Sequence, residues 1–523
     1  MACHFGLLSS NTSGKYLTSD FDGKISLSPL DPSVNKLSKG QLWSLEVDPN
    51  PGEQQREPEG CTHTHYALYS TNGYLSVDKS GKVSAEAEQI GKEQLFEIDV
   101  GTSGSGAWVI RSVAHDTYMG IKSKKIFFKK RETSSSDQRW YVRLAIHPHC
   151  CLLNVKSDKY AHVPQSGRYM TFDAAVPWRS DTLLQLTYSE GYSCFKTTTG
   201  RYVTREGNFV TSLVPDCLFV LQITGDQFDL KDYRGNFNSV NMRGRLMCTS
   251  GKDRASFKLK PSYPHVTFHT KVKGMWMKLF AKEGGGELTT LESTKIDEHE
   301  DEVVFELSPL CCSTSANSKW ALVTVDGRFI NVDHESRLSV ASKATHTAKQ
   351  FEFEFVNDSF ALRHSNSQQY VSIDASGQPF LTANINDIAG KIGMELANRT
   401  SLILQGEFGF VKRETGGRKN KVKCNSADYD ELNLTYEPDT ITYRITDQDG
   451  NPWCMDSLKE HVIAASMGQP TSFILELHTI LGKAKLAIRP LHPDNDCFLK
   501  GYKNGAFTAT GDTLSKETLW TFN

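Results

Sequence analysis

Two short clusters of the sequence hold residue types that can bind a metal ion. Cys61-x-His63-x-His65 and His147-Pro148-His149-Cys150-Cys151 each place thiols beside imidazoles. A structural zinc site takes paired ligands from two separate turns, and neither cluster has that spacing. We therefore interpret both as core or junction residues and expect neither a metal ion nor a cofactor.

Motifs of catalysis are missing from the sequence. It contains no Gly-x-Ser-x-Gly elbow, Walker loop or His-Glu-x-x-His helix. The acidic residues of Glu287–Glu306 alternate with Val303, Val304 and Phe305, which is typical of a solvated loop leading into a strand. We expect a protein that binds through its surface and is not an enzyme.

The densest charge clusters are basic. One run surrounds Ile126, Phe127 and Phe128 with Lys122, Lys124, Lys125, Lys129, Lys130 and Arg131. The simplest interpretation is a solvated hairpin with Ile126 and Phe128 turned inward. The alternative is a patch for an acidic protein or an anionic lipid. A second basic stretch contains Lys412, Arg413, Arg418, Lys419, Lys421 and Lys423.

Composition limits the partners and the compartment. The 523 residues carry a formal net charge of −2, so no overall field attracts nucleic acid. No apolar run reaches the roughly 18 residues that a membrane span needs, and the apolar N-terminus is too short for a signal peptide. We expect a cytoplasmic protein whose 12 cysteines are free thiols.

A repeated phrase must position these residues. It consists of Gly, a basic or polar residue, an aromatic and an aliphatic residue, and recurs at a period of roughly 40 residues. Clear copies begin at Gly14, Gly73, Gly200 and Gly327, and their closing strands end on Trp43, Phe96, Phe219 and Phe351. The Gly supplies a turn. The phrase aromatics Tyr16, Tyr74, Tyr202, Phe329 and Tyr370 are expected to fill cores.

The fold class indicated is all-β. Short runs such as Phe351–Phe355 and Phe473–Leu477 alternate apolar and polar residues with the period of a half-buried strand. Asn384–Leu396 is weakly helical at best. The phrases group by three, which predicts four tandem β-trefoil domains at 1–144, 145–262, 263–396 and 397–523. No Gly/Ser linker separates them, so we expect one rigid body.

At this level of detail the chain resembles the fascin family along its whole length. The fragments that carry the resemblance keep their order and spacing: Phe5–Leu8, Gly14–Thr18, Gln41–Glu46, Leu144–Pro148, Lys159–Val163, Val176–Asp181, Asn398–Arg399, Gly406–Val411 and Thr518–Trp520. Fascins are cytosolic monomers of four trefoils that cross-link actin filaments into tight parallel bundles. The resemblance implies that function, with F-actin as the partner and the cytoskeleton of filopodia and similar cell projections as the location.

The resemblance also implies sites. One family site lies in the cleft between the first and fourth trefoils; the matching positions and their basic neighbours are Lys15, Lys36, Lys39, Glu407, Lys412, Arg413, Lys419, Lys421, Lys500 and Lys503. A second family site precedes the Tyr-Ala-His phrase and corresponds to Lys156 and Lys159.

Several positions depart from the family pattern. The run of three lysines before Gln41 is thinned to Ser38-Lys39-Gly40, and Lys36 replaces a serine whose phosphorylation stops bundling in some members. Phe408 replaces a histidine, and Ile373–Ser376 lacks a lysine pair. A relative that binds filaments without bundling them therefore remains an alternative.

A sugar-binding protein is the other alternative. Many trefoil lectins carry Gln-x-Trp, and this chain has Gln41-Leu42-Trp43 and Gln138-Arg139-Trp140. The same motif also suits a plain core strand.

Overall fold

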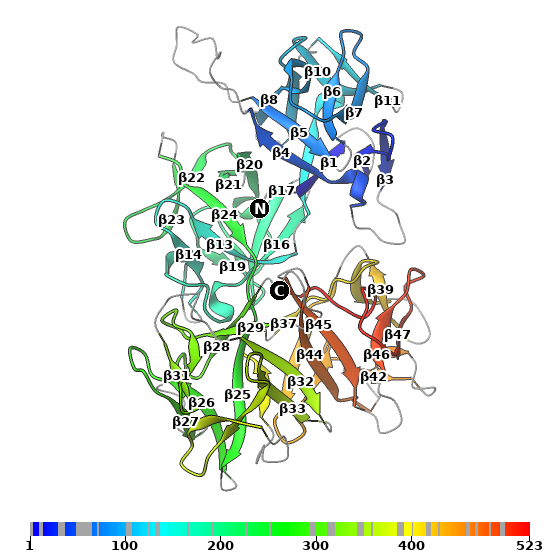
Figure 1. Cartoon of the computed structure of the whole chain (residues 1–523). Helices are drawn as coiled ribbons and strands as arrows, with labels where there is room; N and C mark the ends of the chain where they lie inside the picture. Colours follow the sequence, from blue (N-terminus) through cyan, green and yellow to red (C-terminus); the bar gives the residue numbers. More distant parts are fainter. Residues whose placement is uncertain are drawn as a thin grey trace. The chain divides into compact units, whose positions relative to one another are not determined.

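The computed structural model describes most of the chain, and structural statements below refer to that part. The described residues are 4–9, 14–29, 37–48, 65–70, 73–100, 107–122, 125–130, 136–145, 147–164, 167–189, 192–224, 227–249, 253–272, 275–292, 300–310, 319–341, 350–356, 359–383, 392–399, 401–414, 420–426, 429–456, 461–465, 469–480, 483–491 and 497–522. They contain no α-helix, so the all-β prediction is confirmed for them (Figure 1).

Four groups of strands follow one another along the chain. The first contains β1 (His4–Ser9), β2 (Lys15–Ser19), β3 (Ile25–Pro29), β4 (Trp43–Val47), β5 (Tyr66–Ser70), β6 (Gly73–Val77), β7 (Val83–Ala87), β8 (Phe96–Val100), β9 (Trp108–Ser112), β10 (Thr117–Lys122), β11 (Lys125–Lys129) and β12 (Trp140–Leu144). The second contains β13 (His149–Asn154), β14 (Lys159–His162), β15 (Thr171–Ala174), β16 (Leu184–Ser189), β17 (Tyr192–Thr197), β18 (Tyr202–Val203), β19 (Phe209–Val210), β20 (Phe219–Thr224), β21 (Gln227–Asp232), β22 (Phe237–Val240), β23 (Leu246–Thr249) and β24 (Ser256–Lys260).

The third group contains β25 (His265–Val272), β26 (Met275–Ala281), β27 (Leu288–Glu292), β28 (Phe305–Pro309), β29 (Trp320–Val323), β30 (Ile330–Val332), β31 (Leu338–Val340), β32 (Phe351–Val356), β33 (Ser359–His364), β34 (Gln369–Ile373), β35 (Pro379–Thr382) and β36 (Gly393–Leu396). The fourth contains β37 (Ser401–Leu402), β38 (Phe410–Arg413), β39 (Val422–Ser426), β40 (Leu432–Glu437), β41 (Thr442–Thr446), β42 (Trp453–Met455), β43 (Val462–Ala464), β44 (Phe473–Ile480), β45 (Lys483–Pro490), β46 (Phe498–Gly501) and β47 (Phe507–Gly511). Short 3-10 turns are η1 (Lys39–Gln41), η3 (Lys92–Gln94), η4 (Ser136–Gln138), η5 (Ser180–Thr182) and η6 (Pro215–Cys217).

Strand pairing in the first two groups defines β-trefoils. In the first, β1, β4, β5, β8, β9 and β12 pair in a closed ring, and the hairpins β2–β3, β6–β7 and β10–β11 branch from it. The ring β13, β16, β17, β20, β21 and β24 repeats this plan. Closure leaves the ring strands without an exposed edge, which short strands otherwise have to protect.

The closing aromatic residues of the repeats lie in the cores, as predicted. Trp43, Phe96, Phe219 and Phe351 are all fully buried. The phrase aromatics are more varied than predicted: Tyr16 and Phe329 are buried, but Tyr74, Tyr202 and Tyr370 are only half-buried. The Tyr74 hydroxyl donates to Glu46 at 2.8 Å and that of Tyr370 to Glu354 at 2.9 Å, so these rings lie at the core margin.

A recurrent turn of the form Asp/Asn/Thr-x-x-Gly shapes the hairpins. In Asp232–Gly235 the Asp232 carboxylate accepts the backbone N–H groups of residues 234 and 236, at 2.9 and 2.8 Å. The glycine has a φ of 85°, in the left-handed region that side chains disfavour. Related turns begin at Asp20, Asp78, Thr197, Thr204, Asn241, Thr324, Asp374 and Asp447. Two of the phrase glycines, Gly200 and Gly327, occupy the last position of this turn.

Two compact units divide the chain: Met1–Ala175 with Asp181–Lys260, and Val176–Ser180 with Pro261–Asn523. The four-domain boundaries and the single rigid body therefore remain predictions. Equivalent tyrosines join the strand groups inside each unit. The Tyr188 hydroxyl accepts the backbone N–H of Leu144 at 3.0 Å, and that of Tyr443 accepts Leu396 N–H and donates to Met394 O, both at 2.9 Å.

One weak prediction is corrected at the third group. Within Asn384–Leu396, residues 384–391 lie outside the described part, and the remainder forms strand β36, where a weak helix was considered. β36 pairs with β25 from Val266 opposite Leu396 to His269 opposite Gly393. Pairing with the distant strand β25 decides the conformation of this segment.

Candidate functional site

The first candidate lysines lie in one corner of the first trefoil. Lys15 begins β2 opposite Pro29 and is half-buried. Lys39 lies in η1, which ends on Gln41; the Gln41 side-chain amide donates to Pro29 O at 3.0 Å and to Ser28 Oγ at 2.9 Å. Gln41 therefore holds the turn of Lys39 against the strand that pairs with Lys15.

Both Gln-x-Trp motifs are core anchors. Trp43 and Trp140 are fully buried, and their indole N–H groups donate to Leu17 O at 3.0 Å and Met119 O at 3.2 Å. Gln41 and Gln138 are buried too. Neither motif offers an aromatic face to a sugar, which removes the sequence feature behind the lectin alternative.

The second candidate pair lies on the turn between β13 and β14. Lys156 is exposed there, and Lys159 begins β14 opposite Asn154 and is half-buried. The Asn154 side chain accepts the backbone N–H of Ser157 at 3.0 Å, which fixes the turn. The pair therefore sits on an ordered support.

The fourth group brings three candidate segments together around Trp520. A Cβ added to Gly406 would lie 2.5 Å from this ring, and one added to Gly501 would lie 2.9 Å from it. Cys424 in β39 donates its thiol to Ala506 O at 3.1 Å, beside the turn that carries Lys503. The Glu407 turn, β38–β39 and β46–β47 thus share one buried support.

Ion pairs already engage part of this cluster. Glu407 lies 3.4 Å from Lys516. Lys500 Nζ lies 5.3 Å from the centre of the Tyr502 ring. A hydrogen bond from Ser515 and the charges of Lys516 and Lys500 lower the pKa of Glu517. The cluster is therefore a patch that carries charges of both signs.

Arg413 is held inside its own unit. Its Nη1 lies 2.7 Å from the buried Asp447 and 3.3 Å from Asp449. Burial favours the neutral form of Asp447, but hydrogen bonds from Arg413 and Asn451 outweigh it and lower the pKa of Asp447. The role of Arg413 in binding stays a prediction, and the contact shows a structural role that the sequence did not reveal.

The other candidates of this group differ in surroundings. Lys423 lies 2.5 Å from Glu414 and faces Lys412 across the β38–β39 pair. Lys421 is half-buried beside Ile463, and Lys503 is exposed. Lys36, Lys124, Arg131, Arg418 and Lys419 lie outside the described residues, as do the side chains of Lys39 and Lys122.

The basic run at residues 122–131 includes a hairpin, as the simpler interpretation predicted. β10 pairs with β11 through Met119 opposite Phe128 and Ile121 opposite Ile126. Phe128 is buried and Ile126 packs against the core, while Lys125 and Lys130 are exposed and Lys129 Nζ lies 5.1 Å from the Phe127 ring centre. Binding of a filament or lipid by this hairpin stays a prediction.

Three of the suspected metal ligands in the cluster His147–Cys151 are part of strand β13. His149, Cys150 and Cys151 are buried in β13, and burial raises the pKa of the Cys150 thiol. Within the described residues no group of His, Cys, Asp and Glu is arranged to hold a metal ion. Of the first cluster, only His65 lies in the described part.

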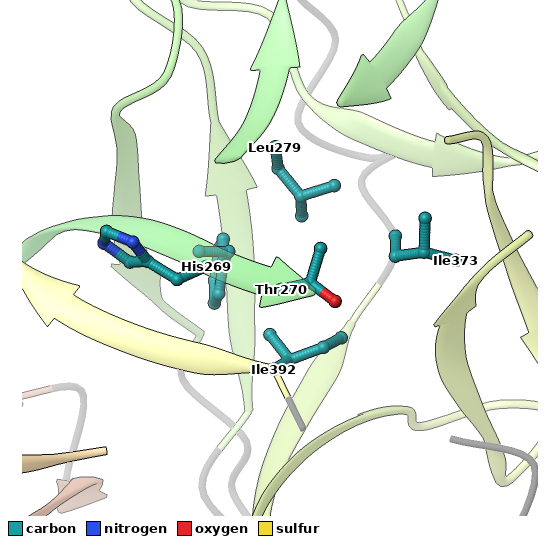
Figure 2. Close-up of a pocket in the computed structure, with 6 residues that line it drawn as sticks. His269, Thr270, Leu279, Ile373 and Ile392 are labelled. Carbon is teal, nitrogen blue, oxygen red and sulfur yellow. The ribbon is translucent and has the colours of Figure 1, made fainter. Parts of the chain in front are cut away.

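A small pocket in the third group is too closed to bind a ligand. Phe268, His269, Thr270, Leu279, Ile373 and Ile392 line it (Figure 2). Their side chains leave no room for a water molecule. None of the described helical turns is long and apolar enough to span a membrane.

The fold and these surfaces define a protein of tandem β-trefoils whose candidate sites are clusters of surface cations. Residues 28–142 and 151–267 match the model of the fascin domain. The chain belongs to the fascin family.

Relatives extend the match over the full length. Fascin of Strongylocentrotus purpuratus is 28% identical over 99% of this chain and 98% of its own. Fascin-2 of Bos taurus is 26% identical over 99% and 97%. Fascin-3 of Mus musculus is 21% identical over 95% and 93%. Among solved structures, the designed three-fold symmetric protein ThreeFoil is similar over 27% of this chain and 96% of its own, with 16% identity and a TM-score of 0.21.

Proposed function

We propose that this protein binds actin filaments and cross-links them into tight parallel bundles. The observation that carries the proposal is the similarity to proteins named fascin over 99% of the chain. The family resemblance supplies the function, and the basic clusters supply surfaces with the charge that an acidic filament requires.

Cross-linking needs at least two filament sites on one molecule. Both compact units carry candidate lysines. The first unit holds Lys15, Lys39, Lys156 and Lys159, and the second holds Lys412, Lys421, Lys500 and Lys503. The two sites that the family resemblance implies, one with Lys15 and Lys500 and one with Lys156 and Lys159, would supply what a cross-linker needs.

The remaining features follow from this proposal. The partner is F-actin and the protein acts as a non-catalytic monomer. It works in the cytoplasm, on the actin cytoskeleton of filopodia and similar projections.

A second candidate function is filament binding without bundling. Arg413 and Lys423 favour it, because carboxylates already engage both side chains. The replacements at Lys36 and Phe408 weaken the family pattern in the same direction. One site would then be too weak to hold a second filament.

Sedimentation with filaments at two speeds separates the two functions. High-speed pelleting reports binding, and low-speed pelleting reports bundles. The proposal expects the protein and actin to pellet together at both speeds. Pelleting at high speed alone would support the second candidate, and pelleting at neither speed would contradict both.

A further inference from the structure

Three hairpins of the second trefoil meet in a continuous cap. The backbone N–H of Met170 donates to Gly207 O at 2.8 Å, and that of Phe172 donates to Gly244 O at 2.6 Å. Isolated bridges pair Tyr169 with Asn208 and Thr171 with Arg245. The segment before β15, the β18–β19 turn and the β22–β23 turn therefore form one surface.

That surface is basic with an apolar apex. We call it the arginine cap, and it contains Arg168, Tyr169, Arg201, Met242, Arg243 and Arg245. Met242 is 104% exposed at the tip of its turn and Tyr169 is 42% exposed. Arg168 and Arg243 are exposed, and Glu206 is the exposed acidic residue beside them. In the described part of the chain, none of the four arginines forms an ion pair.

Two of the arginines are held in place by aromatic rings. Arg245 Cζ lies 4.7 Å from the centre of the Tyr169 ring, and its Nη2 donates to Asn208 Oδ1 at 3.0 Å. Arg201 Cζ lies 4.5 Å from the centre of the Phe209 ring. A stacked guanidinium keeps N–H donors at its rim and loses little freedom when it meets a phosphate.

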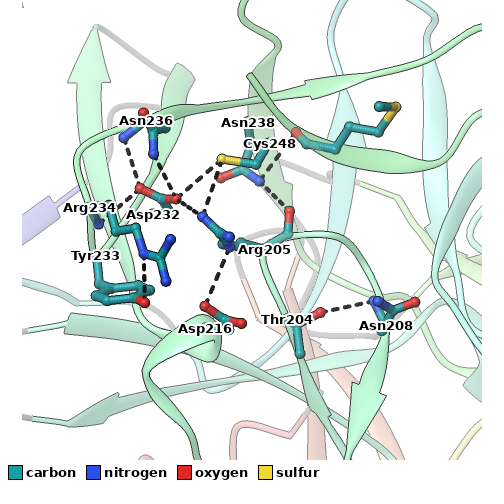
Figure 3. Close-up of polar contacts among 11 residues, drawn as sticks. Thr204, Arg205, Asn208, Asp216, Asp232, Tyr233, Arg234, Asn236, Asn238 and Cys248 are labelled. Atoms are coloured by element: carbon teal, nitrogen blue, oxygen red, sulfur yellow. Dashed lines mark hydrogen bonds and ion pairs between the residues drawn. The ribbon is translucent and has the colours of Figure 1, made fainter. Parts of the chain in front are cut away.

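A buried network fixes the turns beneath the cap. Arg205 lies 2.8 Å from Asp232 and 3.4 Å from Asp216, and Asn238 donates to its carbonyl at 2.7 Å (Figure 3). Cys248 donates its thiol to Asp232 at 3.2 Å. The charge of Arg205 is compensated inside the unit, so this arginine supports the cap and does not belong to its binding surface.

We propose that the arginine cap docks on an anionic membrane surface. Met242 enters the headgroup region, Tyr169 lies at the interface, and the four arginines contact lipid phosphates and carboxylates. A protruding apolar side chain needs a matching socket on a protein partner, whereas a lipid interface accepts it without one. The charge complements an anionic leaflet, which attracts basic residues near its surface.

The first trefoil offers a matched control. Phe21 is 88% exposed on the Asp20–Gly23 turn, so it is also an apolar apex. Its neighbours Asp20 and Asp22 are acidic, which opposes approach to an anionic leaflet. The proposal therefore expects no membrane docking through Phe21, because the arginines of the cap supply the attraction to the leaflet.

Vesicle sedimentation with the full chain tests the proposal. Vesicles of phosphatidylcholine with 30% phosphatidylserine are compared with phosphatidylcholine alone, at about 0.1 M salt. The protein is expected to pellet with the anionic vesicles only. R168Q/R243Q should weaken partition by roughly 25-fold, and M242S by roughly fivefold. F21S should match the wild type.

M242W keeps the test independent of folding defects. Tryptophan favours the membrane interface, so this variant should bind anionic vesicles several-fold more tightly than the wild type. Melting curves confirm that each variant is folded. Absence of binding to anionic vesicles at low salt, or wild-type binding by R168Q/R243Q, would overturn the proposal. If R168Q/R243Q no longer pelleted with actin filaments but still bound vesicles, the cap would be assigned to actin. That result would also overturn the membrane proposal.

Discussion

At the scale of single residues, the existing partners of a cation decide what it can still bind. Arg413 and Arg205 both reach buried carboxylates, Asp447 and Asp232, and both are bound within their own units. Lys503 and Lys156, on turns, are exposed. Since replacing either arginine leaves a buried carboxylate without its cation, substitutions at these arginines should act mainly on stability.

The stability that Asp232 contributes should depend on pH, and this dependence tests whether the ion pairs of these arginines act on stability. Burial opposes its ionisation, but hydrogen bonds from Arg205, Cys248 and Asn236 outweigh burial and lower the pKa of Asp232. A carboxylate with a lowered folded pKa adds stability above its unfolded value, near 3.9, and that stability disappears as the pH falls through the folded pKa. D232N should therefore cost about 2 kcal/mol at pH 7.

The difference between D232N and the wild type should shrink as the pH falls below about 4. Urea unfolding at pH 7 and at acidic pH measures it. Asp216 serves as the control, because it is more exposed and lies 3.4 Å from Arg205. D216N should cost less, and a D232N deficit that does not change with pH would contradict the assignment.

Sequence patterns predicted the burial of some single residues but not the contacts of others. Burial of Trp43 and Phe96 was predictable because each closes a repeated phrase. The Arg413–Asp447 contact was not, because it joins residues from different hairpins and no local pattern marks it. No local pattern indicates that Gly406 and Gly501 share a neighbour, the ring of Trp520.

At the scale of elements, the repeated turn controls how the hairpins present their side chains. Gly235 and Gly244 both have left-handed φ angles, 85° and 76°. A Cβ at Gly235 meets nothing within 4 Å, whereas one at Gly244 lies 2.8 Å from Phe172 O. The two positions separate backbone strain from collision.

Alanine at these two glycines should have unequal effects. G235A should cost about 1 kcal/mol, the strain of a left-handed residue. G244A should cost about 3 kcal/mol, because the chain must also shift at the Phe172–Gly244 hydrogen bond. Urea unfolding of both variants gives the comparison. Equal losses would show that the close contact at Gly244 does not restrain the turn.

Element type was well predicted because two-residue alternation and turn glycines are local signals. The weak helix considered near Asn384 shows the limit, since part of it is strand β36. Its conformation depends on pairing with β25, more than 100 residues earlier in the chain. Pairing with such a distant strand produces no signal in the local sequence.

At the scale of the whole molecule, bundling depends on two sites acting together. K500E/K503E should remove one candidate site, because both residues belong to the β46–β47 hairpin. Low-speed pelleting should fall by at least roughly fivefold while high-speed pelleting changes less than about twofold. K483E, at an exposed position on the β44–β45 hairpin, is the matched control and should bundle normally. Equal losses at both speeds would instead make this hairpin part of the sole binding site.

The sequence predicted trefoil folds and family membership but not the division into two compact units. Val176–Ser180 shows why. It lies within the second trefoil's sequence, yet it belongs to the second unit, where Arg179 donates its backbone N–H to His265 at 3.0 Å and its side chain pairs with Asp301 at 2.7 Å. Contacts between residues this far apart in the sequence depend on surfaces that exist only in the folded protein. A repeat pattern does not encode them.

Electron microscopy of actin filaments mixed with the wild-type protein is the most direct test of the cross-linking function. The expected image is of straight bundles in which neighbouring filaments keep one regular spacing. Filaments that stay single at saturating protein would contradict it.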